Sequence, residues 1–231
     1  MNVKRVVSGL VLFPVAAAIL ILGNKYVVDV AVAILAIMCL HEFYKAFRTG
    51  EKANPITWIG YVLAGMISLI HVLPKDWTVK TIGLLLPITL CILFLYVIIK
   101  NLKVNIIDIA VTFFGIFYIV IFLMYISVIH ENLEHGKLLI WFVFLTAWGT
   151  DIFAYVVGKT LGKHHFTEIS PKKTIEGCIG GTVGAVVITI LYSVLCKYAF
   201  HVEFNYVYVT LITIVLSILS QIGDLAASSV K

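Results

Sequence analysis

Residues 106–129 read IIDIAVTFFGIFYIVIFLMYISVI, a run of 24 residues in which Asp108 is the only charged side chain. A helix that crosses the roughly 30 Å hydrocarbon core of a membrane needs about 20 mostly apolar residues. A helix is favoured there because it satisfies its own backbone hydrogen bonds, which lipid cannot do. This stretch therefore predicts a membrane-spanning helix, and it decides the fold class.

Similar apolar runs recur along the whole chain. The sequence is 61% hydrophobic and 13% charged, whereas soluble domains are about half apolar and about a quarter charged. We predict an all-α polytopic membrane protein with about eight transmembrane helices. The predicted spans lie near residues 6–23, 26–44, 56–73, 81–99, 106–129, 138–158, 176–198 and 205–228.

The placement of lysine and arginine predicts the orientation in the membrane. With the N-terminus in the cytoplasm, 12 of the 17 Lys and Arg residues fall on inner segments and 5 on outer ones. Cytoplasmic loops are usually the ones enriched in these residues. We therefore predict a cytoplasmic N-terminus and a cytoplasmic loop at 159–173. These loops also account for the net charge of +5, so we expect no nucleic-acid partner.

The two parts of the chain differ in their polar content. Residues 1–105 read as ordinary apolar helices, and we predict that they are a scaffold. Residues 106–231 hold the unusual polar features, and we predict that they carry a catalytic site on the cytoplasmic side. Asp151 is the first such feature, about two turns inside the cytoplasmic end of the sixth span. A charge at a helix centre costs roughly 2.5–3.5 kcal/mol on insertion scales, so Asp151 is either functional, paired with a lysine, or close enough to the interface to be solvated.

The last predicted span carries a polar stripe. Ser217, Gln221, Asp224, Ser228 and Lys231 are spaced by four, three, four and three residues, which places them on one face of a helix. Such a face must contact protein or water rather than lipid. One interpretation is hydrogen bonding between helices, and the other is a cation-binding face.

The loop before the seventh span is rich in groups that bind phosphate. Lys172 and Lys173 supply cationic donors, and Ser170 and Thr174 add hydroxyls. Thr174 is also placed to cap the next helix, whose free N–H groups favour an anion, and Glu176 falls in the first turn. The alternative is that basic residues here only follow the rule for cytoplasmic loops.

Small residues open the seventh span at four-residue spacing, which predicts close approach of a neighbouring helix. They are Gly177, Gly180, Gly181 and Gly184. Two carboxylates in the inner half of the membrane, together with a basic loop, suggest a divalent cation that holds a phosphate ester. Magnesium prefers carboxylate oxygens and substrate phosphates. Such a site suits phosphoryl or nucleotidyl transfer to a lipid.

Two motifs then resemble those of a known family. The first is Asp151-x-x-Ala154-Tyr155-x-x-Gly158-x-x-x-Gly162, followed by ISPKKTIEG at 169–177, and the second is QIGDL at 221–225. Together they resemble phosphatidate cytidylyltransferase, also called CDP-diacylglycerol synthase. The resemblance is detailed over residues 148–231 and rests on hydrophobic layout over 1–147.

The resemblance implies transfer of a cytidylyl group from CTP to phosphatidate, giving CDP-diacylglycerol and pyrophosphate, with Mg²⁺ as cofactor. Asp224 would be a metal ligand, Asp151 a ligand or a support for the metal site, and Lys172 and Lys173 would bind phosphates. The implied partners are CTP, phosphatidate and membrane lipid in a bacterial cell membrane, with a homodimer left open. The implied substrate-binding residues are Ser170, Pro171, Thr174, Glu176, Gly177, Tyr155, Gln221, Ser228 and Lys231.

The sequence departs from the family at its end. The family signature begins near Ser228-x-Val230-Lys231 and continues with an Arg, a Lys-Asp, a His-Gly-Gly and an Asp-Arg-x-Asp, whereas this chain stops at Lys231. The chain is therefore either truncated or a diverged member of the family; our hypothesis is truncation, and we expect a chain that ends here to be inactive by itself. Two other functions stay open. A CTP-dependent polyprenol or dolichol kinase would share the basic loop and the carboxylates, and an ion-coupled transporter would use the two aspartates to bind protons or ions.

Overall fold

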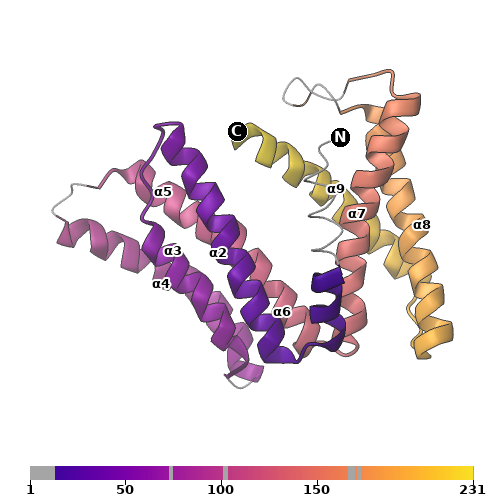
Figure 1. Ribbon diagram of the computed structural model, residues 1–231, viewed down its shortest axis with the longest axis horizontal. Helices are drawn as coiled ribbons and strands as arrows, with labels where there is room; N and C mark the ends of the chain where they lie inside the picture. The colour runs from indigo at the N-terminus through magenta and orange to yellow at the C-terminus, as the bar shows by residue number, and fades with distance from the viewer. Residues whose placement is uncertain (1–13, 73–74, 101–103, 166–169, 171–172, 231) are drawn as a thin grey trace. The chain divides into compact units, whose positions relative to one another are not determined.

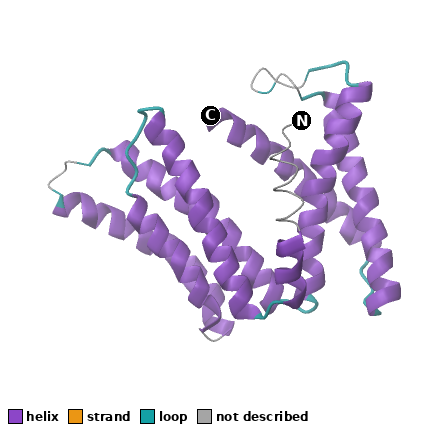
Figure 2. Cartoon of the chain, viewed as in Figure 1, coloured by secondary structure: helices purple, strands orange, loops and turns teal. Residues whose placement is uncertain are grey.

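The computed structural model describes residues 14–72, 75–100, 104–165, 170 and 173–230. Within these ranges every regular element is a helix, as Figure 2 shows. The extended pairing found there is a single bridge between His165 and Thr174. The prediction of an all-α protein is therefore confirmed.

The labelled helices follow one another with short connections (Figure 1), and residues 14–22 are also helical. In chain order they are α2 Lys25–Thr49, α3 Thr57–Met66, the 3-10 helix η1 Ile67–Val72, α4 Lys75–Ile99, α5 Ile106–Gly115, the π-helix η2 Ile116–Ile121, α6 Phe122–Asn132, α7 Gly136–Leu161, α8 Ile175–Phe200 and α9 Tyr206–Val230.

Five helical segments of the described ranges are long and apolar enough to cross a membrane. They are Lys25–Thr49, Ile106–Glu131, Gly136–Leu161, Ile175–Phe200 and Tyr206–Ala226. Thr57–Val72 and Gly83–Ile99 are apolar but shorter, and residues 6–13 of the first predicted span lie outside the described residues. The chain is thus a multi-pass membrane protein, and the count of eight spans stays a prediction.

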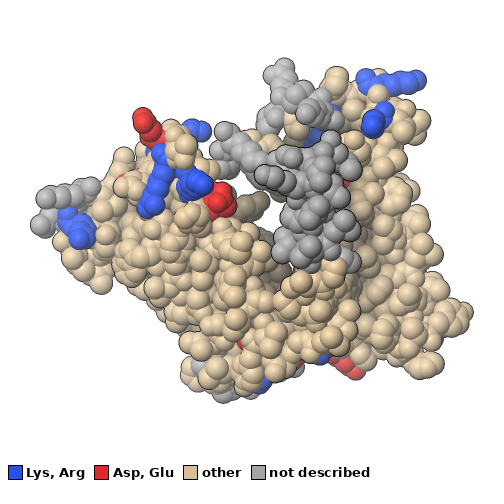
Figure 3. All heavy atoms as spheres, in the orientation of Figure 1, with Lys and Arg blue, Asp and Glu red and all other residues tan. Residues whose placement is uncertain are grey.

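The surface agrees with a lipid environment. On the face drawn in Figure 3, the charged side chains lie near helix ends, and other residues cover the middle of the helices. Large apolar side chains are widely exposed, with Leu22 at 82% and Tyr198 at 75%. Soluble monomers rarely expose large contiguous apolar surface, so these helix faces are suited to contact with lipid.

The chain forms two compact units, Met1–Lys137 and Leu138–Lys231. In the first unit, the buried ring of Tyr44 ties α2 to α5. Its hydroxyl donates to the Thr112 carbonyl oxygen at 3.0 Å, and Gly60 and Gly115 leave room for the ring. The π-helix η2 begins four residues after Thr112; π-helices are rare and occur mostly as single turns inside longer α-helices.

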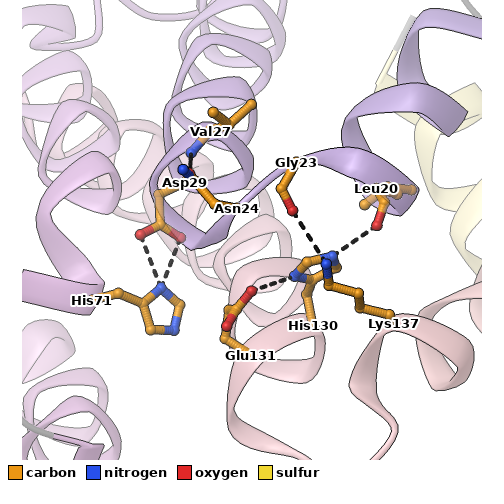
Figure 4. A network of polar contacts seen from close by, with 9 residues as sticks. All are labelled: Leu20, Gly23, Asn24, Val27, Asp29, His71, His130, Glu131 and Lys137. Atoms are coloured by element: carbon orange, nitrogen blue, oxygen red, sulfur yellow. Dashed lines mark hydrogen bonds and ion pairs between the residues drawn. The ribbon is translucent and has the colours of Figure 1, made fainter.

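A second polar network in the first unit lies near the start of α2 (Figure 4). Asp29 is fully buried, and both of its carboxylate oxygens lie 2.9 Å from Nδ1 of His71. His130 contacts the Leu20 carbonyl oxygen through Nε2 at 2.8 Å and the carboxylate of Glu131 through Nδ1 at 3.0 Å. The buried Asp29 carboxylate is therefore paired with the His71 ring, and ionisable groups inside membrane proteins are usually paired in this way.

The second unit is built on close packing of α7 against α8. A Cβ added at Gly181 would lie 2.8 Å from the Thr150 carbonyl oxygen, and one at Gly184 would lie 2.2 Å from Cγ of Phe153. The predicted role of these glycines in helix approach is confirmed. α9 runs obliquely across this pair (Figure 1) and contacts α8.

The predicted boundary at residue 105 was drawn between functional roles, whereas the two compact units are defined by packing and meet at residue 137. Compactness places α5 and α6 in the first unit, whereas the prediction divided the chain by role into a scaffold and a site. The division by role stays a prediction.

Candidate functional site

The start of α8 holds the loop that leaves α7. Thr174 caps α8, because its hydroxyl oxygen accepts a hydrogen bond from the Gly177 N–H at 3.1 Å. The Ile175 N–H donates to the His164 carbonyl oxygen at 3.0 Å. The carboxylate of Glu176 contacts Nδ1 of His164 at 2.6 Å and accepts from its backbone N–H at 3.3 Å. These bonds fix the chain around 164–165 against the first turn of α8.

A cavity of about 310 Å³ lies among α7, α8 and α9, beside this cap. α7 contributes Asp151, Ala154 and Tyr155 to its lining, and α9 contributes Gln221 and Asp224. Side chains far apart in the sequence thus converge on one space.

The loop and the start of α8 complete the lining of the cavity. Ser170, Lys173 and Thr174 come from the end of the loop, and Gly177 and Cys178 come from the first turn of α8. Two hydroxyls and an ammonium group therefore line the same space as the two carboxylates, at the N-terminal end of α8. This combination is suited to an anionic ligand such as a phosphate.

Two of the lining residues form an ion pair. Nζ of Lys173 lies 2.7 Å from a carboxylate oxygen of Asp224, and it also donates to the Gln221 carbonyl oxygen at 3.4 Å. The Lys173 side chain is 22% exposed and that of Asp224 is 57% exposed. An ammonium group therefore lies where a bound cation would contact Asp224.

Asp151 completes the charged groups of the cavity. It interacts electrostatically with Asp224, which has the same charge, and with Lys173, which has the opposite charge. Two carboxylates that face one cavity repel each other, and a cation between them relieves the repulsion. The arrangement thus favours positive charge in the cavity.

The structure confirms one of the two interpretations of the polar stripe of α9, hydrogen bonding between helices, and the cation-binding face stays a prediction. Ser217 and Gln221 make hydrogen bonds to α7 and α8, whereas Asp224 pairs with Lys173. The Ser228 hydroxyl donates to the Asp224 carbonyl oxygen within α9, and Lys231 lies outside the described residues. The inner part of the stripe therefore fastens helices, and Asp224 contributes to the cavity.

The structure brings together most of the predicted site residues. Those that line the cavity are Asp151, Tyr155, Ser170, Lys173, Thr174, Gly177, Gln221 and Asp224. Glu176 and Ser228 are not among the lining residues and contact the protein instead. Pro171 and Lys172 lie outside the described residues.

The predicted site residues did not include four residues at or beneath this cavity. Ala154, which the first motif contains, and Cys178 line it, and Thr150 and Thr182 hydrogen-bond to α9 just below it. A signal existed for two of them. Thr174, Cys178 and Thr182 are spaced by four residues, which places them on one face of α8.

The residues present fit a magnesium ion that is shared with a substrate. Within the described ranges, no three His, Cys, Asp or Glu side chains gather into a complete metal cage. Magnesium, however, is usually held by one or two carboxylates together with substrate phosphates and water. Asp151 and Asp224 meet that requirement, and the hydroxyls of Ser170 and Thr174 add neutral oxygens.

These features define an integral membrane protein with a polar site among its last three helices, suited to a cation and a phosphate group. The sequence model of the cytidylyltransferase family matches residues 3–231, and the chain belongs to that family. The match extends the resemblance well beyond the two motifs at 148–231.

Individual relatives agree with the family match. The phosphatidate cytidylyltransferase of Staphylococcus saprophyticus is 31% identical over 207 residues, which cover 84% of this chain and 76% of the relative. The phosphatidate cytidylyltransferase of Staphylococcus haemolyticus is 30% identical over 231 residues, covering 98% and 84%. That of Synechocystis sp. is 27% identical over 259 residues, covering 100% and 84%.

Proposed function

We propose that this chain transfers a cytidylyl group from CTP to phosphatidate, giving CDP-diacylglycerol and pyrophosphate. The observation that carries the proposal is the ion pair between Lys173 and Asp224, in a cavity that Asp151 also lines. Lys173 belongs to the first motif that resembles the family, and Asp224 belongs to the second. The named relatives are phosphatidate cytidylyltransferases, which favours this reaction over transfer by a lipid kinase.

The site residues have distinct roles in this reaction. Lys173 binds phosphate oxygens of CTP, and Ser170 and Thr174 orient them; the predicted partner Lys172 adds a second cation. Asp224 and Asp151 would hold a Mg²⁺ ion, which would supply positive charge to neutralise the phosphates. A phosphate oxygen of the lipid attacks the α-phosphorus of CTP, the bond to the β-phosphate breaks, and pyrophosphate leaves. Such a transfer depends mainly on positioning and charge neutralisation.

The proposed setting follows from the charge distribution. Eight spans with a cytoplasmic N-terminus place the 159–173 loop in the cytoplasm, where CTP is found. The cavity then lies at the inner leaflet of a bacterial cell membrane, within reach of the phosphate of a lipid. A homodimer stays a prediction from the sequence.

The products distinguish this reaction from that of a kinase. We would incubate the protein in detergent with CTP, phosphatidate and Mg²⁺ and measure pyrophosphate and CDP. The chain is assayed as it stands and also joined to the family's continuation of the signature that begins at Ser228. We expect pyrophosphate and CDP-diacylglycerol from the form that carries the family's continuation. Release of CDP in place of pyrophosphate, or no nucleotide turnover by either form, would overturn the proposal.

A further inference from the structure

A hydroxyl of α9 joins three helices directly beneath the cavity. Oγ of Ser217 lies 2.8 Å from Oγ1 of Thr150 on α7 and 3.0 Å from Oγ1 of Thr182 on α8. Nε2 of Gln221 lies 3.4 Å from the same Ser217 oxygen. Thr150 and Ser217 are both fully buried. We refer to Thr150, Thr182, Ser217 and Gln221 as the hydroxyl hub.

The direction of each bond in the hub follows from the acceptors around it. Thr182 donates to the Cys178 carbonyl oxygen at 3.2 Å, so its hydroxyl hydrogen is used. Ser217 then donates to Thr182 and accepts from Thr150. A serine hydroxyl has one hydrogen and two lone pairs, so Thr150 and Thr182 use the hydrogen and one lone pair, and the Gln221 amide at 3.4 Å is the longest of the three contacts.

The hub lies next to both carboxylates of the site. Thr150 immediately precedes Asp151 on α7, and Ser217 and Gln221 lie two turns and one turn before Asp224 on α9. Gln221 also lines the cavity, and its backbone carbonyl oxygen accepts a hydrogen bond from Nζ of Lys173. The bond between Thr150 and Ser217 is therefore a direct tie between the helices that carry Asp151 and Asp224.

We propose that Thr150 and Ser217 are positioning residues, which set the separation of Asp151 and Asp224 across the cavity. The inference rests on the proposed function, because it concerns the same site. Both residues are fully buried, so water cannot replace a lost hydroxyl, and the two helices are then free to shift. Residues that orient metal ligands typically change metal affinity or activity by about 10–100-fold when they are mutated.

Thr150→Val tests the proposal, because valine has nearly the shape of threonine and lacks the hydroxyl. The matched control is Thr146→Val. Thr146 lies one turn earlier on the same helix, is 1% exposed, and its hydroxyl has no hydrogen-bond partner among the described residues. Thr150→Ser keeps the hydroxyl and should restore function. A second pair, Ser217→Ala and Ser193→Ala, repeats the comparison, since buried Ser193 also lacks a described partner.

Two measurements are made on every variant in Mg²⁺ titrations. They are the rate of pyrophosphate release from the form with the family's continuation, and the rise in the thermal unfolding midpoint that Mg²⁺ and CTP produce in this chain. For Thr150→Val and Ser217→Ala we expect about a tenfold or larger increase in half-saturating Mg²⁺ in both measurements. The two controls and Thr150→Ser should stay close to the unmodified protein.

A further variant separates positioning from general helix packing. Thr213→Val removes the buried bond from Thr213 to Thr189 between α9 and α8, at 3.0 Å, outside the hub. The proposal is overturned if this variant shifts the Mg²⁺ titration as much as Thr150→Val, or if Thr150→Val matches Thr146→Val. If the unmodified protein releases no pyrophosphate, the proposed function fails, and the thermal shift still tests the hub. Absence of that shift in the unmodified protein as well would overturn both.

Discussion

Replacing Gly184 by alanine should separate α7 from α8. The added Cβ would lie 2.2 Å from Cγ and 2.6 Å from Cβ of Phe153. Carbon atoms pack best at about 3.5–4.0 Å, so the two residues must move apart by roughly 1.3 Å or more. The contact involves the base of the aromatic side chain, so rotation of the ring alone cannot relieve it.

The magnitude follows from two opposing effects. Overpacking a close helix contact costs about 1–3 kcal/mol, and alanine in place of glycine favours a helix by about 1 kcal/mol. We therefore expect Gly184→Ala to lower the free energy of unfolding by about 1 kcal/mol. Gly65→Ala is the control, because a Cβ there has no atom within 4 Å. It should stabilise the protein by about 1 kcal/mol.

The assay is unfolding in mixed micelles of increasing SDS content, followed by circular dichroism. The two variants should differ by about 2 kcal/mol. Phe153→Ala removes the nearest ring atoms and leaves its Cβ, so combined with Gly184→Ala it should recover at least about 0.5 kcal/mol relative to additivity. If Gly184→Ala is as stable as Gly65→Ala, the close contact between α7 and α8 is wrong.

Three further predictions concern single side chains. Lys173→Met should lower the rate of pyrophosphate release by about 10²–10³-fold, because it removes a key electrostatic group. The control is Lys197→Met, which removes an exposed lysine paired with Glu203 and should leave the rate nearly unchanged. Glu176→Ala removes the partner of His164, so backbone hydrogen exchange at residues 162–165 should accelerate, and unchanged exchange would argue against that contact. Tyr44→Phe should lower the free energy of unfolding by about 1 kcal/mol, because its hydroxyl hydrogen bond is buried; equal stability in the SDS titration would contradict this.

The long spans were predictable because the hydrocarbon core sets the length of an apolar helix. The interruptions were not. Thr57–Val72 changes from an α-helix to a 3-10 helix at Ile67, and the π-helix Ile116–Ile121 divides a continuous apolar run. Both changes fall within apolar runs of the sequence. The π-helix lies beside the bond from Tyr44 to Thr112, which joins residues 68 positions apart and leaves no local pattern.

The charged part of the site was predictable for a related reason. Asp151, Asp224 and Lys173 are costly in a membrane segment or concentrated in one loop, so the sequence alone made them candidates. The α9 side of the hydroxyl hub was anticipated, because Ser217 and Gln221 lie on the polar stripe for which bonding between helices was one interpretation. Their partners Thr150 and Thr182 were not predictable, because threonine can also bond to the backbone of its own helix. Thr146 and Thr150 are one turn apart on α7 and look equivalent in sequence, yet Thr150 bonds to Ser217 on α9 whereas the Thr146 hydroxyl has no partner among the described residues.

The most direct test of the proposed site follows the label of radioactive CTP into lipid. We expect label from the α-phosphate of CTP, and none from the γ-phosphate, to appear in lipid when phosphatidate and Mg²⁺ are present. Asp224→Asn and Asp151→Asn should abolish the transfer, whereas Glu203→Gln, which changes an exposed carboxylate paired with Lys197, should keep it. Label from the γ-phosphate in the lipid, or undiminished transfer by Asp224→Asn, would contradict the account.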